Sequence, residues 1–161
     1  MRQRRDKNAV RVGKRSPSSP WEPTLDGVVV LPSGRPIRFR RQGRPATELA
    51  PTLALYLNGH SAPQVAWEAY WVRWRWWRPP SDQAFMQGIF EAAWSAAVHE
   101  RVEVVSGGGG RIGTAVTCLG ILDGLDTRDA LLYARSTIPA TRMSRSQIEF
   151  VEAFGRRRLG K

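Results

Sequence analysis

The chain has few of the side chains that form disulfides or bind metals. Its 161 residues include one cysteine, Cys118, and two histidines, His60 and His99. A single cysteine excludes an internal disulfide, and two histidines this far apart do not form a metal-ligand cluster. We therefore expect neither a metal nor another cofactor. His60, in the turn-like 58-NGHS-61, is predicted to lie in a surface loop.

The chain also lacks a long apolar run. No uninterrupted hydrophobic stretch is long enough to cross a bilayer, and no apolar core follows the positive charges at the N-terminus, as a secretory signal requires. The sequence therefore predicts a cytoplasmic protein with no membrane partner.

Acidic residues are fewer than basic ones, and much of the excess lies at the two ends. The formal net charge is +11, and hydrophobic residues make up 42% of the chain, which is enough for one folded domain. We predict a disordered basic N-terminal tail over residues 1–20, a folded domain over 21–155 and a basic C-terminal tail over 156–161. Such tails permit weak, sequence-independent contact with nucleic acid.

The first part of the chain is typical of strands. Residues 25–41 contain two β-prone runs around a Pro-Ser-Gly turn, which predicts a hairpin. Residues 53–57 form another apolar run, and residues 65–77 are predicted to begin as a strand and continue into an aromatic loop. Residues 101–105 predict a short buried strand.

The second part is typical of helices. Ser81 or Asp82 can cap a helix whose apolar face recurs every three or four residues, and 112–122 is predicted to be a helix that ends at Asp123-Gly124. Further helices are expected over 127–136 and from Ser144 to Gly155, the last with Gln147 in a capping box. The first apolar face consists of Phe85, Met86, Ile89, Phe90, Ala93, Trp94, Ala97 and Val98. The fold class is therefore α/β or α+β, with a central sheet flanked by helices.

The stretch 102-VEVVSGGGGRIGT-114 places four glycines between the predicted strand and helix, where backbone N–H groups can cradle a phosphate. Gly108, Gly110 and Gly113 match G-x-G-x-x-G, which favours a dinucleotide site, and Asp126 lies at a plausible distance for the ribose acid. However, 127–136 has helical spacing and no further strand follows, so the second half of a dinucleotide fold is missing.

A nucleoside-triphosphate loop is a second interpretation of the same glycines. Gly108, Gly113 and Thr114 have the spacing of that motif, but Ile112 stands where a lysine must reach the outer phosphates. An apolar side chain cannot replace that charge, so this interpretation is rejected.

A third interpretation starts from 110-GRIGT-114, because Gly-Arg-x-Gly-Thr ends the phosphate loop of a known family. From about Val28 to Phe154 the chain resembles short bacterial protein tyrosine phosphatases. The resemblance implies that Arg111 forks onto two phosphate oxygens, while loop amides and the helix N-terminus hold the others. The phosphate-binding residues that it implies are Ser106, Gly107, Gly108, Gly109, Gly110, Arg111, Ile112, Gly113 and Thr114.

The chain lacks the nucleophile that this family uses. The family has a reactive cysteine six residues before the arginine, and counting back from Arg111 reaches Val105. If the loop is one residue shorter than in the family, Ser106 occupies the position of the reactive cysteine instead. Neither residue supplies a thiolate, and no nearby histidine could activate a serine. Cys118, two turns into the predicted helix, is expected to be a buried structural thiol.

The general acid is missing as well. The family carries it on a Trp-Pro-Asp loop, and the matching segment here is Trp74-Arg75-Trp76, with arginine for proline and tryptophan for aspartate. Asp82 is nearby, but its position favours a helix cap. Trp71 and Trp74 are predicted to be core residues, whereas a role in attracting or stacking on a phosphorylated ligand is the alternative for this Trp/Arg segment.

Two missing catalytic groups in two separate segments indicate a pseudophosphatase that binds a phosphorylated or other anionic ligand without hydrolysing it. One alternative is residual phosphatase activity, with Ser106 or another group as nucleophile. Another is a basic module that binds nucleic acid. A further interpretation concerns the loop itself: four glycines cost conformational entropy to order, so Arg111 could instead pair with a carboxylate or cap carbonyls within the fold.

Overall fold

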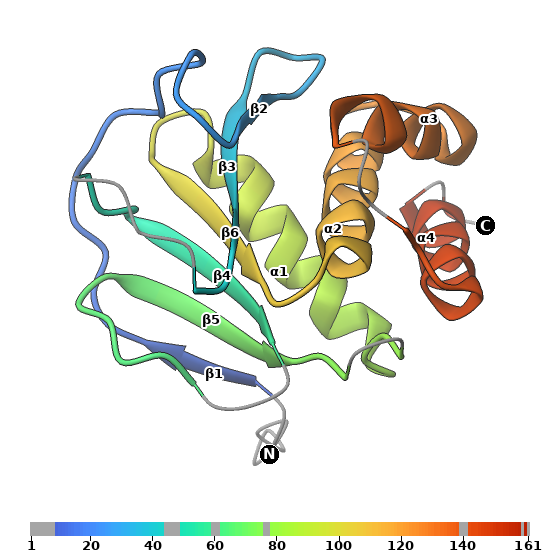
Figure 1. The fold of residues 1–161 in the computed structure, drawn as a ribbon, viewed down its shortest axis with the longest axis horizontal. Coiled ribbons are helices and arrows are strands. Elements are labelled where there is room, and N and C mark those ends of the chain that lie inside the picture. Colours follow the sequence, from blue (N-terminus) through green and yellow to red (C-terminus); the bar gives the residue numbers. More distant parts are fainter. Residues whose placement is uncertain are drawn as a thin grey trace.

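The computed structural model describes residues 9–43, 49–58, 62–75, 78–138, 142–158 and 160. Within these ranges the chain forms one six-stranded sheet and four α-helices (Figure 1). The elements are β1 (Ala9–Val12), β2 (Val28–Val30), β3 (Pro36–Arg41), β4 (Leu53–Asn58), β5 (Glu68–Arg73), α1 (Gln83–Ala96), β6 (Val102–Ser106), α2 (Gly109–Leu122), α3 (Thr127–Thr137) and α4 (Arg145–Arg158).

The strand order is β1-β5-β4-β6-β3-β2. The four inner strands are parallel to one another, and β1 and β2 pair antiparallel at the two edges. Strand β6 inserts between β3 and β4, although it follows both in the sequence. The connection after β6 therefore lies in the middle of the edge where the parallel strands end, which is where open α/β sheets bind ligands.

The helices lie on one face of the sheet (Figure 1). One hydrophobic core joins that face to buried residues of all four helices, including Phe90 of α1, Leu119 of α2 and Phe154 of α4. A smaller cluster on the other face includes Tyr56, Trp71 and Val105. The α/β fold class predicted from the sequence is thus confirmed, with the helices on one face of a mixed sheet.

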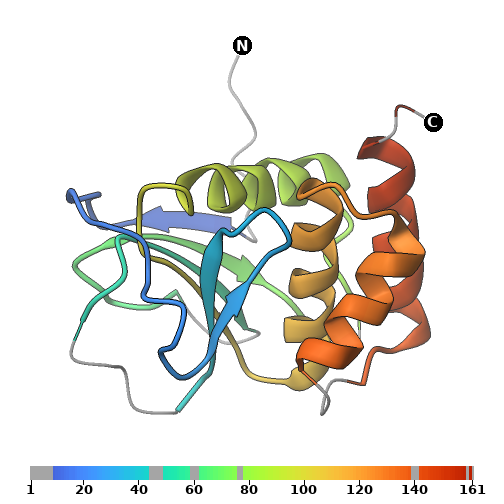
Figure 2. The same ribbon diagram turned by 90° about the horizontal axis from the view of Figure 1, so that it is seen from above.

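Helix α2 is the central helix. Every residue from Arg111 to Leu122 is buried, because α2 packs against β6 and α1 as well as against α3 and α4 (Figure 2). A helix that is apolar on all sides is stable only in such surroundings. The prediction of a buried Cys118 is confirmed, since this thiol is 0% exposed.

Local signals in the sequence correctly predicted several elements. The hairpin forms from β2 and β3, with Val28 opposite Arg38. Asp82 caps α1 by accepting a hydrogen bond from the backbone N–H of Phe85 at 2.9 Å. Ser144 and Gln147 form the capping box of α4, each accepting a backbone N–H of the other.

The N-terminal boundary differs from the prediction of a disordered tail through Pro20. Residues 9–12 form β1 along β5, and Arg11 and Arg15 pair with the buried Glu68 at 3.1 and 3.4 Å. A buried carboxylate needs such partners, so these arginines belong to the folded domain.

Two helix ends also differ from their predicted positions. Helix α2 begins at Gly109, three residues before the predicted start at Ile112, and α4 continues through Gly155 to Arg158. The predicted C-terminal tail is therefore helical over 156–158. Val98, predicted on the apolar face of α1, is 41% exposed and follows the end of that helix. In the part of the chain that the structure describes, no helix is both long and apolar enough to span a bilayer.

Candidate functional site

The connection between β6 and α2 is shorter than the sequence suggests. Because β6 ends at Ser106 and α2 begins at Gly109, only Gly107 and Gly108 lie between them. The other two glycines, Gly109 and Gly110, form the first turn of the helix. A two-residue connection cannot wrap around a phosphate, so the groups that can reach an anion here are those at the N-terminus of α2.

Ser106, and not Val105, lies at the start of this connection. Val105 is 2% exposed and belongs to the cluster on the other face of the sheet with Tyr56 and Trp71. The Ser106 hydroxyl donates to the carbonyl oxygen of Gly108 at 3.1 Å and accepts from the backbone N–H of Gly108 at 3.3 Å. Neither partner is a base that could take the hydroxyl proton.

The N-terminus of α2 has no side-chain cap, although α1, α3 and α4 are capped by Asp82, Asp126 and Ser144. The first helical hydrogen bond runs from the N–H of Ile112 to the carbonyl oxygen of Gly108. The N–H groups of the preceding helical residues therefore have no partner within the helix, and no acidic side chain lies in this first turn. Such an end attracts an anion.

Arg111 is 8% exposed, and its guanidinium lies beneath the glycine connection. Its Nη1 donates to the carbonyl oxygens of Leu57 and Trp74 at 3.1 and 3.2 Å, as the carbonyl-capping interpretation predicted. Its Nε is buried and has no hydrogen-bond partner in the described part of the chain. Burial lowers the pKa of Arg111 from its ordinary value, but an arginine stays charged at neutral pH.

No carboxylate neutralises this buried charge among the residues that the structure describes. By contrast, Arg38 and Arg40 reach the buried Glu103 at 3.6 and 3.0 Å. Uncompensated positive charge at an uncapped helix N-terminus favours binding of a negative group from solution.

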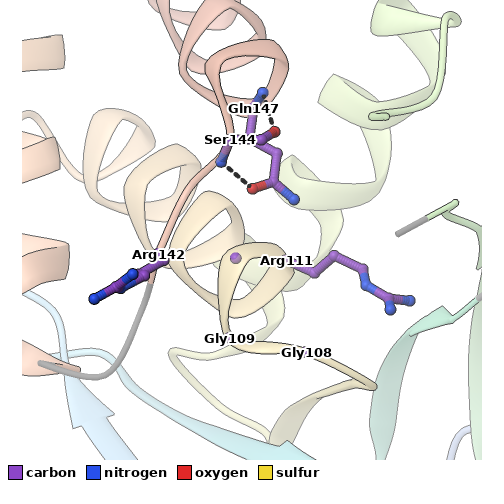
Figure 3. Close-up of a pocket in the computed structure, with 7 residues that line it drawn as sticks. Gly108, Gly109, Arg111, Arg142, Ser144 and Gln147 are labelled. Carbon is purple, nitrogen blue, oxygen red and sulfur yellow. Dashed lines mark hydrogen bonds between the residues drawn. The ribbon is translucent and has the colours of Figure 1, made fainter. Parts of the chain in front are cut away.

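A pocket of about 360 Å³ opens beside the N-terminus of α2, toward the start of α4 (Figure 3). In Figure 3, Arg111 and Arg142 extend to opposite sides of the first turn of α2, and Gln147 lies above it. The pocket is lined by Gly108, Gly109, Gly110, Arg111, Arg142, Ser144 and Gln147.

Gly110 allows α4 to approach this closely. A Cβ atom at position 110 would lie 2.6 Å from the carbonyl oxygen of Arg142 and 2.6 Å from Gln147 Oε1. Gln147 is 2% exposed, and its Oε1 accepts the N–H of Ser144 at 2.9 Å. Among the described residues its Nε2 has no hydrogen-bond partner, so this amide can still donate into the pocket.

The other residues implied by the family resemblance lie deeper in the structure. Ile112 is 4% exposed in the main core, and Gly113 is buried within α2. Thr114 is 0% exposed, and its hydroxyl donates to the carbonyl oxygen of Gly110 at 2.7 Å. None of these three residues lines the pocket, and of the three only Thr114 bonds back to the first turn of the helix through its side chain.

From the sequence, Trp74-Arg75-Trp76 was matched to the loop that carries the general acid in the family. In the structure, this segment contributes Trp74 to the core. Trp74 is 0% exposed, and its ring lies 5.8 Å from that of Phe150 in a tilted arrangement. Trp71 is also buried, so both predicted core tryptophans are confirmed. Arg75 is exposed, while Trp76 lies outside the described residues. Asp82, the only nearby candidate acid in the sequence, is confirmed as a helix cap.

Further arginines lie at the edge where the parallel strands end. Arg41, at the end of β3, is opposite Ser106, and Arg73, at the end of β5, is opposite Asn58. Both arginines are exposed, and neither has a carboxylate partner among the described residues. The potential around the end of β6 is therefore positive on both sides.

Other candidate reactive groups lie away from this site or are unreactive. Burial raises the pKa of the Cys118 thiol well above its ordinary value, so this cysteine is not a nucleophile. The described part of the chain contains no group of three His, Cys, Asp or Glu residues that could bind a metal. His99 is exposed, and His60 lies outside the described residues.

Sequence reasoning missed two residues that line the pocket. Gln147 was predicted as a capping residue, but nothing in the sequence indicated that its free amide nitrogen would face α2. Arg142 had no local signal at all. Their positions depend on the packing of α4 against Gly110, which only the three-dimensional structure reveals.

The fold of this chain is similar to that of a known phosphatase. The crystal structure of DUSP15, a dual-specificity phosphatase, matches it with a TM-score of 0.51 and 20% sequence identity, over 65% of this chain and 69% of that chain. No family model matches the chain, and no curated protein matches it. Identity this low shows the fold alone: a mixed α/β fold, with a central sheet and helices, similar to that of this phosphatase.

Proposed function

We propose that this protein is a pseudophosphatase that binds a phosphate-bearing or other oxyanionic ligand at the N-terminus of α2 and does not hydrolyse it. The ligand contacts the free N–H groups of the first turn, and Arg111 supplies positive charge from below. The proposed binding segment is the one implied by the family resemblance, residues 106–114, with direct contacts from the first helical residues Gly109, Gly110 and Arg111.

One observation carries this proposal. Arg111 is 8% exposed, and among the described residues it has neither a neutralising carboxylate nor a hydrogen-bond partner for its Nε. A charge in that position is costly unless something compensates it. Two carbonyl oxygens satisfy Nη1 but do not neutralise the charge, whereas a bound oxyanion would.

The absence of hydrolysis follows from the side chains at the same edge. The residue at the start of the glycine connection is a serine without a base, and Trp74-Arg75 replaces the segment that carries the acid in the family. A general acid alone typically contributes about 10²–10⁴-fold in rate. A hydroxyl that stays protonated is a poor nucleophile, so both halves of the reaction lack their catalyst.

Orthophosphate and tungstate serve as probes for this function in thermal unfolding and titration calorimetry. Both anions should bind the wild-type protein and raise its melting temperature, because a ligand that binds the native state stabilises it. Arg111→Lys keeps the charge but loses the fork and should weaken binding at least tenfold. Arg128→Ala, which removes an exposed arginine of α3, is the matched control and should bind as the wild type does.

The alternatives give different results in the same experiments. Sustained release of phosphate from an aryl phosphate, abolished in Arg111→Ala, would mean that the protein is an active phosphatase. Strong binding to DNA that survives Arg111→Ala and disappears when both basic ends are removed would mean a nucleic-acid module. Absence of any saturable binding of phosphate or tungstate would refute the proposal.

A further inference from the structure

One basic segment of the sequence contributes no residue to the pocket beside α2. Residues 69–81 contain three arginines, Arg73, Arg75 and Arg78, and no acidic residue. All three side chains are exposed, and none has a carboxylate partner among the residues that the structure describes. This arginine cluster lies at the end of β5, where the chain leaves the sheet toward α1 (Figure 1).

The first two arginines of the cluster point away from the core on the same side of the chain. Trp74, which lies between them, is 0% exposed, and its N–H donates to the carbonyl oxygen of Asn58 at 3.1 Å. The sheet pairing therefore continues one residue past β5. Because successive side chains of an extended chain alternate, Arg73 and Arg75 share the outer side, with Cα atoms about 7 Å apart.

The last two arginines of the cluster lie directly opposite each other. Arg75 and Arg78 form an antiparallel bridge, in which the N–H of Arg78 donates to the carbonyl oxygen of Arg75 at 3.0 Å. Side chains of such a pair lie on one face with Cβ atoms about 5 Å apart, and like charges in this arrangement repel each other. The backbone pairing holds the two cations together, so an anion from solution would relieve the repulsion.

The spacing and the residue type favour a chain of phosphates as that anion. A guanidinium can form two parallel hydrogen bonds to one phosphate group. A nucleic-acid strand carries one negative charge on every residue, so neighbouring phosphates can meet neighbouring guanidiniums. An acidic peptide offers carboxylates at such intervals only where its sequence repeats them. The net charge of +11 attracts a long polyanion from a distance.

We infer that the arginine cluster binds the phosphodiester backbone of a single-stranded nucleic acid. The contacts are to phosphates and not to base edges, so binding does not depend on the base sequence. It needs no phosphate monoester and is therefore independent of the function proposed for the N-terminus of α2. The two surfaces adjoin, because Arg111 donates to the carbonyl oxygen of Trp74 at 3.2 Å.

Fluorescence anisotropy with the full chain tests this inference. The probe is a fluorescein-labelled oligothymidylate of about 12 residues without a terminal phosphate, titrated at several salt concentrations. Replacing all three arginines of the cluster with alanine should weaken binding at least about tenfold. It should also lower the slope of log K against log salt by about 2, since each phosphate contact contributes about 0.7. Unchanged affinity in this cluster variant would refute the inference.

A control variant with the same charge separates the cluster from general electrostatic attraction. Arg128, Arg135 and Arg156 are exposed arginines of α3 and α4, and replacing all three with alanine removes the same charge elsewhere. This variant should lose less than about threefold in affinity. An equal loss in both variants would mean that net charge alone binds the strand, and the inference would be wrong.

Poly-L-glutamate with the same number of charges tests the class of partner. It should bind the wild type at least about tenfold more weakly than the oligonucleotide, because a carboxylate chain lacks the regular phosphates. If it binds as tightly, the partner of the cluster is an acidic protein and the inference is wrong.

Tungstate distinguishes this inference from the proposed function. It should bind the cluster variant as it binds the wild type, since the N-terminus of α2 is intact there. Loss of tungstate binding in that variant would mean that the cluster belongs to the α2 site, and would overturn the inference of a separate surface. If only the wild type binds the strand but neither protein binds tungstate, the proposed function alone fails.

Circular dichroism melts show that each variant is folded. Arg75→Ala and Arg78→Ala, each tested alone, should weaken strand binding about threefold, so they decide the question if the triple substitution does not fold. Wild-type affinity in both single variants would contradict the inference in that case.

Discussion

The guanidinium of Arg111 donates to the carbonyl oxygen of Leu57 at 3.1 Å, which ties the N-terminus of α2 to the end of β4. Arg111, to which we assign a part in anion binding, is thus a structural residue in this protein. It satisfies carbonyl groups at the edge of the sheet while keeping its charge beneath the glycine connection. If the proposed function is right, binding and stability depend on the same side chain.

Replacing Arg111 with alanine should lower the free energy of unfolding. The carbonyl oxygens of Leu57 and Trp74 would lose a buried donor, and leaving such a group unsatisfied costs about 1–3 kcal/mol. Urea denaturation of wild type and variant measures the change. Arg111→Lys, which can still donate to one carbonyl oxygen, should lower the free energy of unfolding by less. Equal stability of the alanine variant and the wild type would contradict the structural role of these hydrogen bonds.

Replacing Ser106 with cysteine should not create a phosphatase. The variant supplies sulfur at the start of the glycine connection, but that connection has only two residues, and Trp74-Arg75 supplies no acid. Phosphate release from an aryl phosphate should stay at the wild-type level, as measured by a colorimetric phosphate assay. Multiple turnovers by this variant would show that the thiolate was the only missing group.

Gly110→Ala should destabilise the protein and disturb the pocket. Its Cβ would lie 2.6 Å from the backbone oxygen of Arg142, which cannot move without shifting the start of α4. Overpacking of this kind costs about 1–3 kcal/mol. Gly88→Ala is the control, because Gly88 is an exposed position of α1 with nothing within 4 Å of the added atom. That change should stabilise α1 by about 0.5–1 kcal/mol.

Chemical denaturation of both glycine variants tests this contrast. A destabilised Gly110→Ala beside a stabilised Gly88→Ala supports the close approach of α4 to α2. If Gly110→Ala is as stable as the wild type, α4 does not lie against this turn.

Stability should fall at alkaline pH because of Cys118. Burial raises the pKa of this thiol in the native state, whereas in the unfolded chain it titrates near pH 8.5. The unfolded state therefore loses a proton that the native state retains, so the contribution of Cys118 to stability is full below about pH 8.5 and declines as the pH rises further. Unfolding free energies of wild type and Cys118→Ala, measured at pH 7.5 and 9.5, should differ less at pH 9.5.

The sequence predicted the elements whose signals are local. The alternating residues and turn of the β2–β3 hairpin, the cap at Asp82 and the capping box of Ser144 and Gln147 all involve residues close together in the chain. The interpretation that a thiolate and a general acid are missing also depends on single positions, and it stays a prediction. The fold class followed from the order of these elements.

Features that depend on contacts between distant residues could not be predicted. Gly155 suggested the end of a helix, but α4 continues through it, because this glycine packs against Thr127 and a Cβ there would lie 2.1 Å from the Thr127 hydroxyl. The arginines near the N-terminus suggested a solvated tail. In the structure, Arg11 forms an ion pair with Glu68 at the edge of the sheet. Glycines have low helix propensity, so the start of α2 at Gly109 was also missed.

The central claim, that the site holds an oxyanion but does not cleave a phosphate ester, is tested most directly by following phenyl phosphate with ³¹P NMR in the presence of the protein. We predict that its resonance shifts or broadens in a saturable manner, that the change disappears in Arg111→Ala, and that no inorganic phosphate accumulates over hours. Growth of the inorganic phosphate signal through several turnovers, or an ester resonance that wild-type protein leaves unchanged, would contradict the account.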